Sequence, residues 1–349
     1  MTLEEIRSVD PTGMYDAIKG FPSQVSDAIR IGTTARVRIS VRRLQNIVLT
    51  GLGGSAIGGD LLRSYLADEL DLPFIVNRNY TLPQFVGPKT LVIVSSYSGN
   101  TEETIAAYKE ALQRNSPTLC ITSNGVIEGL ARRKKSPLIS IPGGFQPRAA
   151  LGYSFFPLLI TMARLGLVRN KDREIKETLA LLQSKSKKYA DCESAENHAL
   201  RLAQQLFGRL GVVYSSTERF DAVGTRWRGQ TAENGKSLMF GNVFPEMNHN
   251  ELVGWKTLKE QMLEMQVFFL RDKDDHHRVQ ARMNLTKQII SEHTSHITEV
   301  WSEGRTLLAR MFSLIYLGDW TSYYLAILNR VDPMPVYIID YLKEELGKA

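Results

Sequence analysis

SSYSGNTEET, residues 95–104, directly follows the β-branched run TLVIV at residues 90–94. That run has the length and composition of a buried parallel strand, and a helical pattern follows from Glu102 to Leu112. A strand that passes through a short turn into a helix directs several backbone N–H groups at one point, where an anion is favoured. The turn also carries three closely spaced hydroxyl side chains, Ser96, Ser98 and Thr101. This stretch therefore predicts a phosphate site.

A simpler interpretation is that Ser98 and Thr101 only cap the helix, with Glu102 and Glu103 favourably placed at the positive end of its dipole. A cap needs a single hydroxyl, whereas this turn supplies several at close spacing, which favours the anion site. The two carboxylates oppose an anion unless they point outward.

Strands and helices alternate along both halves of the chain. Strand-like runs in the first half lie at residues 46–50, 73–76, 90–94 and 118–121. In the second half we expect strands at 211–215, 265–270 and 297–301, and helices at 223–240, 274–292 and 307–328. This spacing predicts an α/β protein with two doubly wound domains, each a mainly parallel sheet flanked by helices.

A chain of 349 residues exceeds the usual size of a single core, which predicts two domains. We expect the first domain to cover residues 1–165, with a helical region over 1–45. We expect the second to cover residues 166–349, with a C-terminal helix. Its polar start, from Lys171 to Leu210, indicates connecting helices that bury little core.

The composition, 43% hydrophobic and 23% charged, is typical of a soluble globular protein. The net charge of +6 suits an anionic substrate, but the basic clusters at 132–135 and 185–188 lack interleaved aromatics and predict solvated helix faces rather than a nucleic-acid site. No signal peptide or membrane span is evident, and Cys120 and Cys192 have no metal spacing. We therefore expect a cytoplasmic protein that uses no metal or other cofactor and binds neither nucleic acid nor membrane.

A glycine-rich loop, GLGGSAIGGD, follows the first predicted strand. Gly51, Gly53 and Ala56 fit the dinucleotide fingerprint G-x-G-x-x-A, so a dehydrogenase is one hypothesis. Where that fingerprint expects an acidic residue the chain has Arg78 between asparagines, which allows at most a phosphorylated nicotinamide cofactor. Ser55 favours another function, because two glycine- and hydroxyl-bearing loops on nearby strands can surround a small phosphorylated ligand.

Five motifs occur in a fixed order along nearly the whole chain: GLGGSAIGGD at 51–60, SYSGNTEET at 96–104, QPRAALG at 146–152, ENGKS at 233–237 and IDYLK at 339–343. In this order and spacing they resemble the sugar isomerase (SIS) domain proteins, and specifically the bifunctional phosphoglucose/phosphomannose isomerases. The resemblance implies two SIS-type domains and an isomerase that interconverts glucose 6-phosphate, and also mannose 6-phosphate, with fructose 6-phosphate through a cis-enediolate. It also implies a homodimer.

The resemblance implies a role for each matching residue of the first domain. The phosphate is held by the hydroxyls that match Ser55, Ser96, Ser98 and Thr101, and the sugar is lined by Gly53 and Gly54. Arg148 matches the arginine that stabilises the enediolate, since a guanidinium is permanently cationic and can face developing oxygen charge. The alternative for Arg148 is an ordinary surface-loop arginine.

The remaining catalytic residues implied by the resemblance lie in the second half. Glu233 matches the base that moves a proton between C1 and C2, although it could also be a helix-surface residue paired with Lys236. His249 matches the histidine that opens the sugar ring, supplied by the partner subunit. Lys343 matches the terminal lysine that assists ring opening, with Lys348 as a competing choice and helix decoration as the alternative for both.

Two other functions stay open at this point. A sugar-phosphate sensor would use the same pocket without chemistry, and would bind fructose 6-phosphate without exchanging the C2 proton. An NADP-dependent dehydrogenase built on the glycine loop would show a thermal shift with its cofactor.

Overall fold

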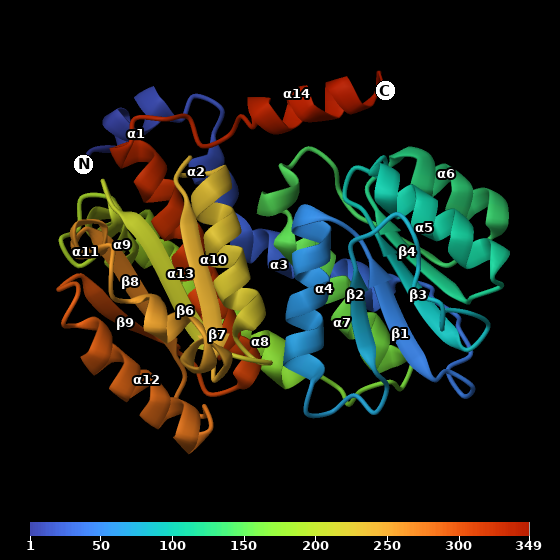
Figure 1. Ribbon diagram of the computed structural model, residues 1–349. Coiled ribbons are helices and arrows are strands. Elements are labelled where there is room, and N and C mark those ends of the chain that lie inside the picture. Colours follow the sequence, from blue (N-terminus) through green and yellow to red (C-terminus); the bar gives the residue numbers. More distant parts are fainter. Residues whose placement is uncertain (349) are drawn as a thin grey trace. The chain divides into compact units, whose positions relative to one another are not determined.

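The computed structural model describes residues 1–348, and the chain forms two compact units, each with its own parallel β-sheet (Figure 1). The N-terminal-sheet unit comprises Gly20–Gln183 and Gly304–Ala309. The C-terminal-sheet unit comprises Met1–Lys19, Ser184–Glu303 and Arg310–Ala349. Two parallel sheets with flanking helices confirm the predicted fold class.

The N-terminal-sheet unit contains five parallel strands in the order β2-β1-β3-β4-β5. Their bounds are β1 Asn46–Thr50, β2 Phe74–Asn77, β3 Thr90–Ser95, β4 Thr118–Thr122 and β5 Leu138–Ser140. All residues of β3 and β4 are buried, as expected for the inner strands of a sheet covered on both faces. This order is that of a doubly wound sheet whose direction of winding reverses between β1 and β3.

Helices complete this unit. They are α3 Phe21–Thr34, α4 Gly53–Leu66, α5 Glu102–Gln113, α6 Gly125–Lys134, the 3₁₀ turn η1 Pro147–Ala149, α7 Leu151–Arg164 and the first part of α8 Asp172–Ala190. Residues of α5 and α6 pack with β1, β3 and β4 in one apolar cluster that includes Val48, Val92 and Tyr108. Helix α7 packs against α3 and α4, so α4 is held between the sheet and α7.

The C-terminal-sheet unit has four parallel strands in the order β7-β6-β8-β9. The strands are β6 Leu210–Ser216, β7 Met239–Phe244, β8 Met265–Arg271 and β9 Ile297–Trp301. The helices are α1 Leu3–Val9, α2 Met14–Lys19, α9 His198–Leu206, α10 Asp221–Glu233, η2 Glu246–His249, η3 Glu251–Gly254, α11 Lys259–Leu263, α12 His277–Ile290, most of α13 Leu307–Leu328, and α14 Tyr337–Leu346. The strand order repeats that of β1 to β4.

The predicted division placed the first nineteen residues in one domain with residues 20–165. In the structure they group with the second sheet instead. Asp10 explains the difference, because its carboxylate accepts the N–H groups of Met14 and Tyr15 at 2.9 and 2.7 Å and the Tyr323 hydroxyl at 3.0 Å. The Tyr15 ring also packs edge-on against Trp320 at 5.5 Å. Helices α1 and α2 therefore belong to the C-terminal-sheet unit.

Three expectations about single segments were wrong. The helix predicted over 223–240 ends earlier, because α10 stops at Glu233 and the edge strand β7 begins at Met239. The region predicted as helical over 1–45 has no helix after Thr34. The connecting helices bury a real core, since Leu182, Tyr189 and most of α9 are shielded from solvent.

Within residues 1–348 we find no helix with both the length and the apolar character needed to cross a bilayer.

Candidate active site

The glycine loop after β1 and the hydroxyl turn after β3 meet at the carboxyl ends of two adjacent strands. β1 and β3 pair directly, with Thr50 beside Val94 at their ends. Ser55, in the first turn of α4, accepts a hydrogen bond from the backbone N–H of Tyr97 at 3.1 Å. In a sheet of this order ligands bind in the crevice between β1 and β3, where the winding reverses. The two loops therefore form the candidate site.

Hydrogen bonds inside the turn hold its hydroxyls in place. The Oγ of Ser96 lies 3.0 Å from the Oγ1 of Thr101 and accepts the N–H of Gly99 at 3.1 Å. The Oγ of Ser98 accepts the N–H of Asn100 at 3.3 Å. Thr101 is the N-cap residue of α5, yet its side chain makes no capping hydrogen bond. The interpretation of Thr101 as a simple helix cap is therefore wrong.

One of the two carboxylates in the first turn of α5 is accounted for. Glu102 is exposed, and its carboxylate accepts a hydrogen bond from the Tyr80 hydroxyl at 3.4 Å. Solvent therefore screens its charge. The carboxylate is also directed toward a neutral donor, so it opposes an anion at the turn less than the sequence suggests.

Glycine is favoured at two positions at the start of α4 for different physical reasons. Gly53 has φ of +50°, and a Cβ built there would meet nothing within 4 Å, which leaves open space beside the loop. A Cβ on Gly54 would lie 2.4 Å from the carbonyl oxygen of Pro147 and 3.2 Å from the backbone nitrogen of Arg148. Gly54 is therefore required for η1 to pack directly on α4.

This packing brings Arg148 to the same end of the sheet as the glycine loop and the hydroxyl turn. Arg148 lies in η1, is only 3% exposed, and donates from Nη1 to the Gln146 side-chain oxygen at 3.4 Å. A guanidinium is rarely buried unless other polar groups stabilise it. The alternative of an ordinary surface arginine is therefore wrong.

Tyr97 connects three parts of the site, and the sequence did not reveal it. Its backbone N–H donates to Ser55, and its carbonyl accepts from the Ser123 hydroxyl at 2.6 Å. Its phenol oxygen donates to the Pro142 carbonyl at 3.0 Å and accepts the N–H of Phe145 at 2.9 Å. Burial raises the pKa of Tyr97 above the ordinary value, so the side chain stays a neutral phenol. The one available signal was a large aromatic residue in a turn of small polar residues.

Glu233, His249 and Lys343 all belong to the C-terminal-sheet unit. Glu233 is the last residue of α10 and is half-buried, whereas His249 is exposed at the end of η2. Lys343 is exposed on α14, with its ammonium 4.0 Å from the Asp340 carboxylate. Lys348, the competing lysine, is also exposed and forms ion pairs with neighbouring glutamates.

Lys236 links the Glu233 end of α10 to the segment that precedes α14. Its ammonium donates to the backbone carbonyls of Glu233, Pro335 and Pro333 at 2.5, 2.6 and 3.5 Å. An ammonium at a helix C-terminus is favoured by the helix dipole. The helix end that carries Glu233 is thus tied to the segment that leads into α14.

The corresponding edge of the second sheet carries buried carboxylates instead of a hydroxyl turn. Asp272 and Asp275 follow β8 and are 0% and 6% exposed. Asp275 accepts from the Ser216 hydroxyl at 2.6 Å, and Asp272 accepts from the Arg310 guanidinium at 2.7 Å. Burial raises the pKa of Asp275. These carboxylates are already bound to Ser216 and Arg310, so the turn after β8 offers no cluster of free hydroxyl donors for a phosphate.

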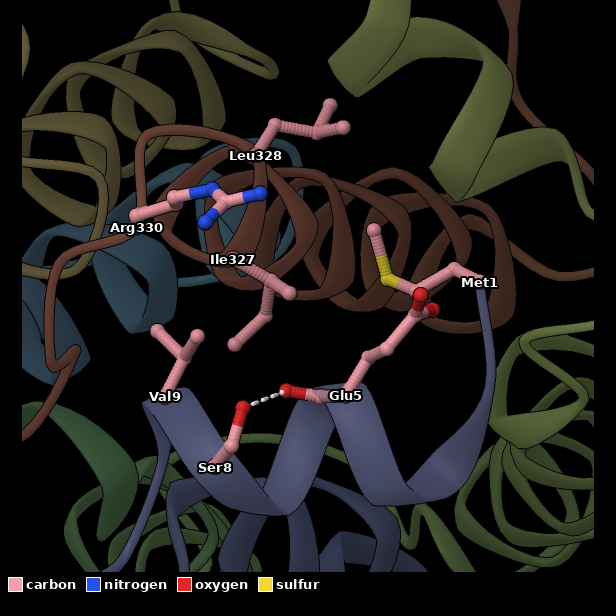
Figure 2. A pocket seen from close by; sticks show the side chains of 7 residues that line it. All are labelled: Met1, Glu5, Ser8, Val9, Ile327, Leu328 and Arg330. Atoms are coloured by element: carbon pink, nitrogen blue, oxygen red, sulfur yellow. Dashed lines mark hydrogen bonds between the residues drawn. The ribbon is translucent and has the colours of Figure 1, made fainter.

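A cavity of about 340 Å³ lies elsewhere in the C-terminal-sheet unit, between α1 and the end of α13 (Figure 2). Its lining consists of Met1, Glu5, Ser8, Val9, Ile327, Leu328 and Arg330. It is not at the carboxyl end of any strand, and its lining is mostly apolar and includes Glu5 as well as Arg330, so it is a poor site for an anion.

The dinucleotide interpretation loses support from the position of Arg78. Its guanidinium pairs with the carboxylate of Asp60 in α4. The cation that would have to bind the additional phosphate of the cofactor is therefore already engaged. Among residues 1–348 there is also no group of three or more His, Cys, Asp or Glu side chains that could hold a metal ion.

Comparison with known proteins agrees with this arrangement. The model of the SIS domain matches residues 40–134, and that of the bacterial phospho-glucose isomerase C-terminal SIS domain matches residues 195–346. A solved structure of a hypothetical protein from Thermus thermophilus superposes with a TM-score of 0.75 at 16% sequence identity. The match covers 99% of this chain and 93% of that protein. At this identity the match supports the fold but not the function.

Curated relatives identify the family. A bifunctional phosphoglucose/phosphomannose isomerase from Caldicellulosiruptor bescii is 43% identical over 336 residues, which cover 96% of this chain and 99% of the relative. A protein of the same name from Aquifex aeolicus is 37% identical and covers 87% of this chain and 91% of its own. With its two hydroxyl-bearing loops at the reversal point of a SIS-type sheet, the chain therefore belongs to the family of bifunctional phosphoglucose/phosphomannose isomerases.

Proposed function

We propose that this protein is an aldose–ketose isomerase that interconverts glucose 6-phosphate, and also mannose 6-phosphate, with fructose 6-phosphate. The observation that carries the proposal is the meeting of the glycine loop after β1 with the hydroxyl turn after β3. A hydrogen bond to a charged phosphate contributes about 1.5 to 3 kcal/mol. Roughly three or four such bonds would anchor a phosphosugar without a lysine. Membership of the family supports the same reaction.

In this proposal the phosphate binds at the turn and the sugar lies along the glycine loop. The hydroxyls of Ser55, Ser96, Ser98 and Thr101 and the N-terminus of the twelve-residue helix α5 supply the anion site. The open space beside Gly53 allows the sugar to approach the backbone. Gly54 contributes by letting η1 approach α4.

The isomerisation itself needs one base and one cation. Glu233 removes the C2 proton of the open-chain aldose, which leaves a cis-enediolate, and returns a proton to C1 from the same face, while the O2 hydroxyl proton passes to O1. The negative charge that develops on the two oxygens is stabilised by the guanidinium of Arg148. Because the substrate binds as a closed ring, His249 and Lys343 exchange the protons that open it.

We also propose that the protein acts as a homodimer in which His249 is supplied by the partner subunit. Its exposed position at the end of η2 supports this role. Helix α14 supports a dimer, because none of its ten residues is buried. Its exposed apolar residues include Tyr337, Ile338, Tyr341, Leu342 and Leu346, at 77%, 87%, 65%, 57% and 55%. An isolated helix of this length is unstable in water, so a second copy is the expected cover.

The test is an assay of the purified protein with each aldose phosphate separately, with and without a chelator, followed by detection of fructose 6-phosphate. In D₂O we expect deuterium at C2 of glucose 6-phosphate, because the proton on the base exchanges with solvent before it returns. A protein that binds fructose 6-phosphate but incorporates no deuterium would be a sensor. A thermal shift with a nicotinamide cofactor would favour the dehydrogenase.

A further inference from the structure

We propose that Tyr97 is a positioning residue for Arg148. Its phenol oxygen fixes the loop that carries Arg148, residues 142–148, to the hydroxyl turn after β3, which is called the phosphate turn below. The proposal rests on the proposed function, because it takes Arg148 as the group that stabilises the enediolate. It adds a residue that contacts no reacting atom, and whose hydroxyl acts only through the arginine.

The loop has an evident need for such an anchor. Residues 142–148 read PGGFQPR, and Gly144 has φ of +94°, so the segment between β5 and η1 contains two adjacent residues of high conformational freedom. The Pro142 carbonyl precedes the two glycines and the Phe145 N–H follows them. Both bind the same phenol oxygen, at 3.0 and 2.9 Å. One atom therefore fixes both ends of the diglycine.

The backbone of Tyr97 is itself part of the phosphate turn. Its N–H is bonded to Ser55 of the glycine loop, and its carbonyl is bonded to the N–H and hydroxyl of Ser123, at 3.1 and 2.6 Å. The side chain has only two rotatable bonds between this fixed backbone and the phenol oxygen. The distance between the phosphate turn and the Arg148 loop is thereby set by one rigid ring.

Two further contacts define what the phenol does not control. Phe145 packs its ring on Tyr153 of α7 at 5.8 Å, and η1 packs on Gly54. These contacts keep the loop near α4 when the hydroxyl is removed. We therefore expect the fold to be retained, while the backbone position of the loop, and with it that of Arg148, becomes less well defined. A displacement of a catalytic group by about 1 Å can reduce a reaction rate by roughly 100-fold.

The test is a double-mutant cycle with Y97F, R148A and the combined variant, measured in the direction from fructose 6-phosphate. We expect Y97F to lower kcat about 10-fold, to change KM less than about twofold, and to leave the inhibition constant of inorganic phosphate unchanged, because the turn keeps its backbone bonds. The combined variant should have the kcat of R148A alone. A control is Y108F, which removes another buried phenol hydroxyl, bonded to Ser136 at 2.8 Å, and should keep full kcat.

A second measurement does not depend on catalysis. In the ligand-free protein, Y97F should lose at least about 10-fold of the hydrogen-exchange protection of the Phe145 amide, whereas amides of β4 keep theirs. Unchanged protection, or multiplicative losses of kcat in the combined variant, would overturn the proposal. If R148A instead retains wild-type kcat, the proposed role of Arg148 fails and the role of Tyr97 in catalysis fails with it, even if the exchange result stands.

Discussion

Glu233 sits where a helix ends, and the ammonium of Lys236 binds its backbone carbonyl. We expect E233Q to lower kcat at least about 100-fold, because glutamine keeps the shape of the side chain but cannot accept the proton. Inhibition by inorganic phosphate should be unchanged, since the proposed anion site lies on α4, α5 and the turn after β3. The measurement is steady-state kinetics together with deuterium incorporation at C2.

A suitable control for this variant is E292Q, which makes the same change at an exposed residue after α12. Its kinetics should equal those of the wild type. Near wild-type turnover of E233Q would remove Glu233 from the mechanism and leave the phosphate site standing.

The sequence predicted the two loops on nearby strands, because the alternation of strands and helices implies the order of a doubly wound sheet. It could not reveal the link through Tyr97. The partners of the phenol are backbone atoms 45 and 48 residues further along the chain, and backbone atoms carry no sequence signature. The roles of Glu233, His249 and Lys343 stay predictions.

At the scale of elements, the contact between α4 and η1 depends on the absence of one side chain. We expect G54A to lower the Tm and to reduce kcat, because its methyl group would meet the Pro147 carbonyl at 2.4 Å and push η1, with Arg148, away. The control is G129A in α6, where a Cβ meets nothing within 4 Å. That variant should be unchanged or up to about 1 kcal/mol more stable. Thermal unfolding and kinetics check both, and a fully active G54A would contradict the assigned packing.

The start of α8 is joined to the end of α4 by Glu69 and Lys171, whose side chains are 14% and 6% exposed. Burial would raise the pKa of Glu69, but hydrogen bonds from the Lys171 ammonium and the Arg169 N–H outweigh it and lower the pKa below 4.5. Because the folded-state pKa is the lower one, the carboxylate stabilises the fold above the unfolded pKa, and this contribution is lost as the pH falls through the folded pKa.

We therefore expect E69Q to lower the free energy of unfolding by about 1 to 3 kcal/mol at pH 7. The difference from the wild type should shrink as the pH is lowered through the acid range. Urea unfolding between pH 7 and pH 3 measures it. E128Q removes an i,i+4 pair with Arg132 on α6 and should cost less than about 0.5 kcal/mol. A difference between E69Q and the wild type that does not change with pH would contradict the assignment.

Strand β7 shows where sequence patterns fail at this scale. It is an edge strand that pairs with β6, and of its six residues Met239 and Phe244, at its ends, are the buried ones. It therefore lacks the continuous apolar run that identifies β3 and β4. A short segment between turns with Gly241 inside it offers no strand signal strong enough to separate it from the preceding helix.

For the whole molecule, the proposed dimer can be tested by complementation. In a mixed dimer of E233Q and H249A chains, one site has both substitutions and the other has neither if His249 crosses the interface. Random reassociation should then restore roughly a quarter of the wild-type activity, since about half of the dimers are mixed and one site in each is intact. Activity is measured after partial unfolding and refolding of the mixture. If His249 acts within its own chain, no activity returns.

The grouping of helices α1 and α2 with the second sheet also belongs to this scale. Asp10 and Tyr323, which bond directly, are separated by 313 residues, and no local pattern announces such a pair. Sequence patterns predicted two domains, but they did not show that the first nineteen residues pack with the second one. The cause is that side-chain packing, rather than order along the chain, decides the membership of a unit.

The carboxylates after β8 have a consequence for stoichiometry. The four strands of the second sheet have the same order as β1 to β4, yet Asp272 and Asp275 follow β8, the strand that corresponds to β3 and its hydroxyl turn. We therefore expect this edge of the second sheet to bind no phosphosugar, and its unit to supply other groups to the proposed reaction, among them Glu233. Calorimetric titration with a phosphosugar should accordingly saturate at one molecule per polypeptide, and a second equivalent bound with comparable strength would show that the second sheet also binds the ligand.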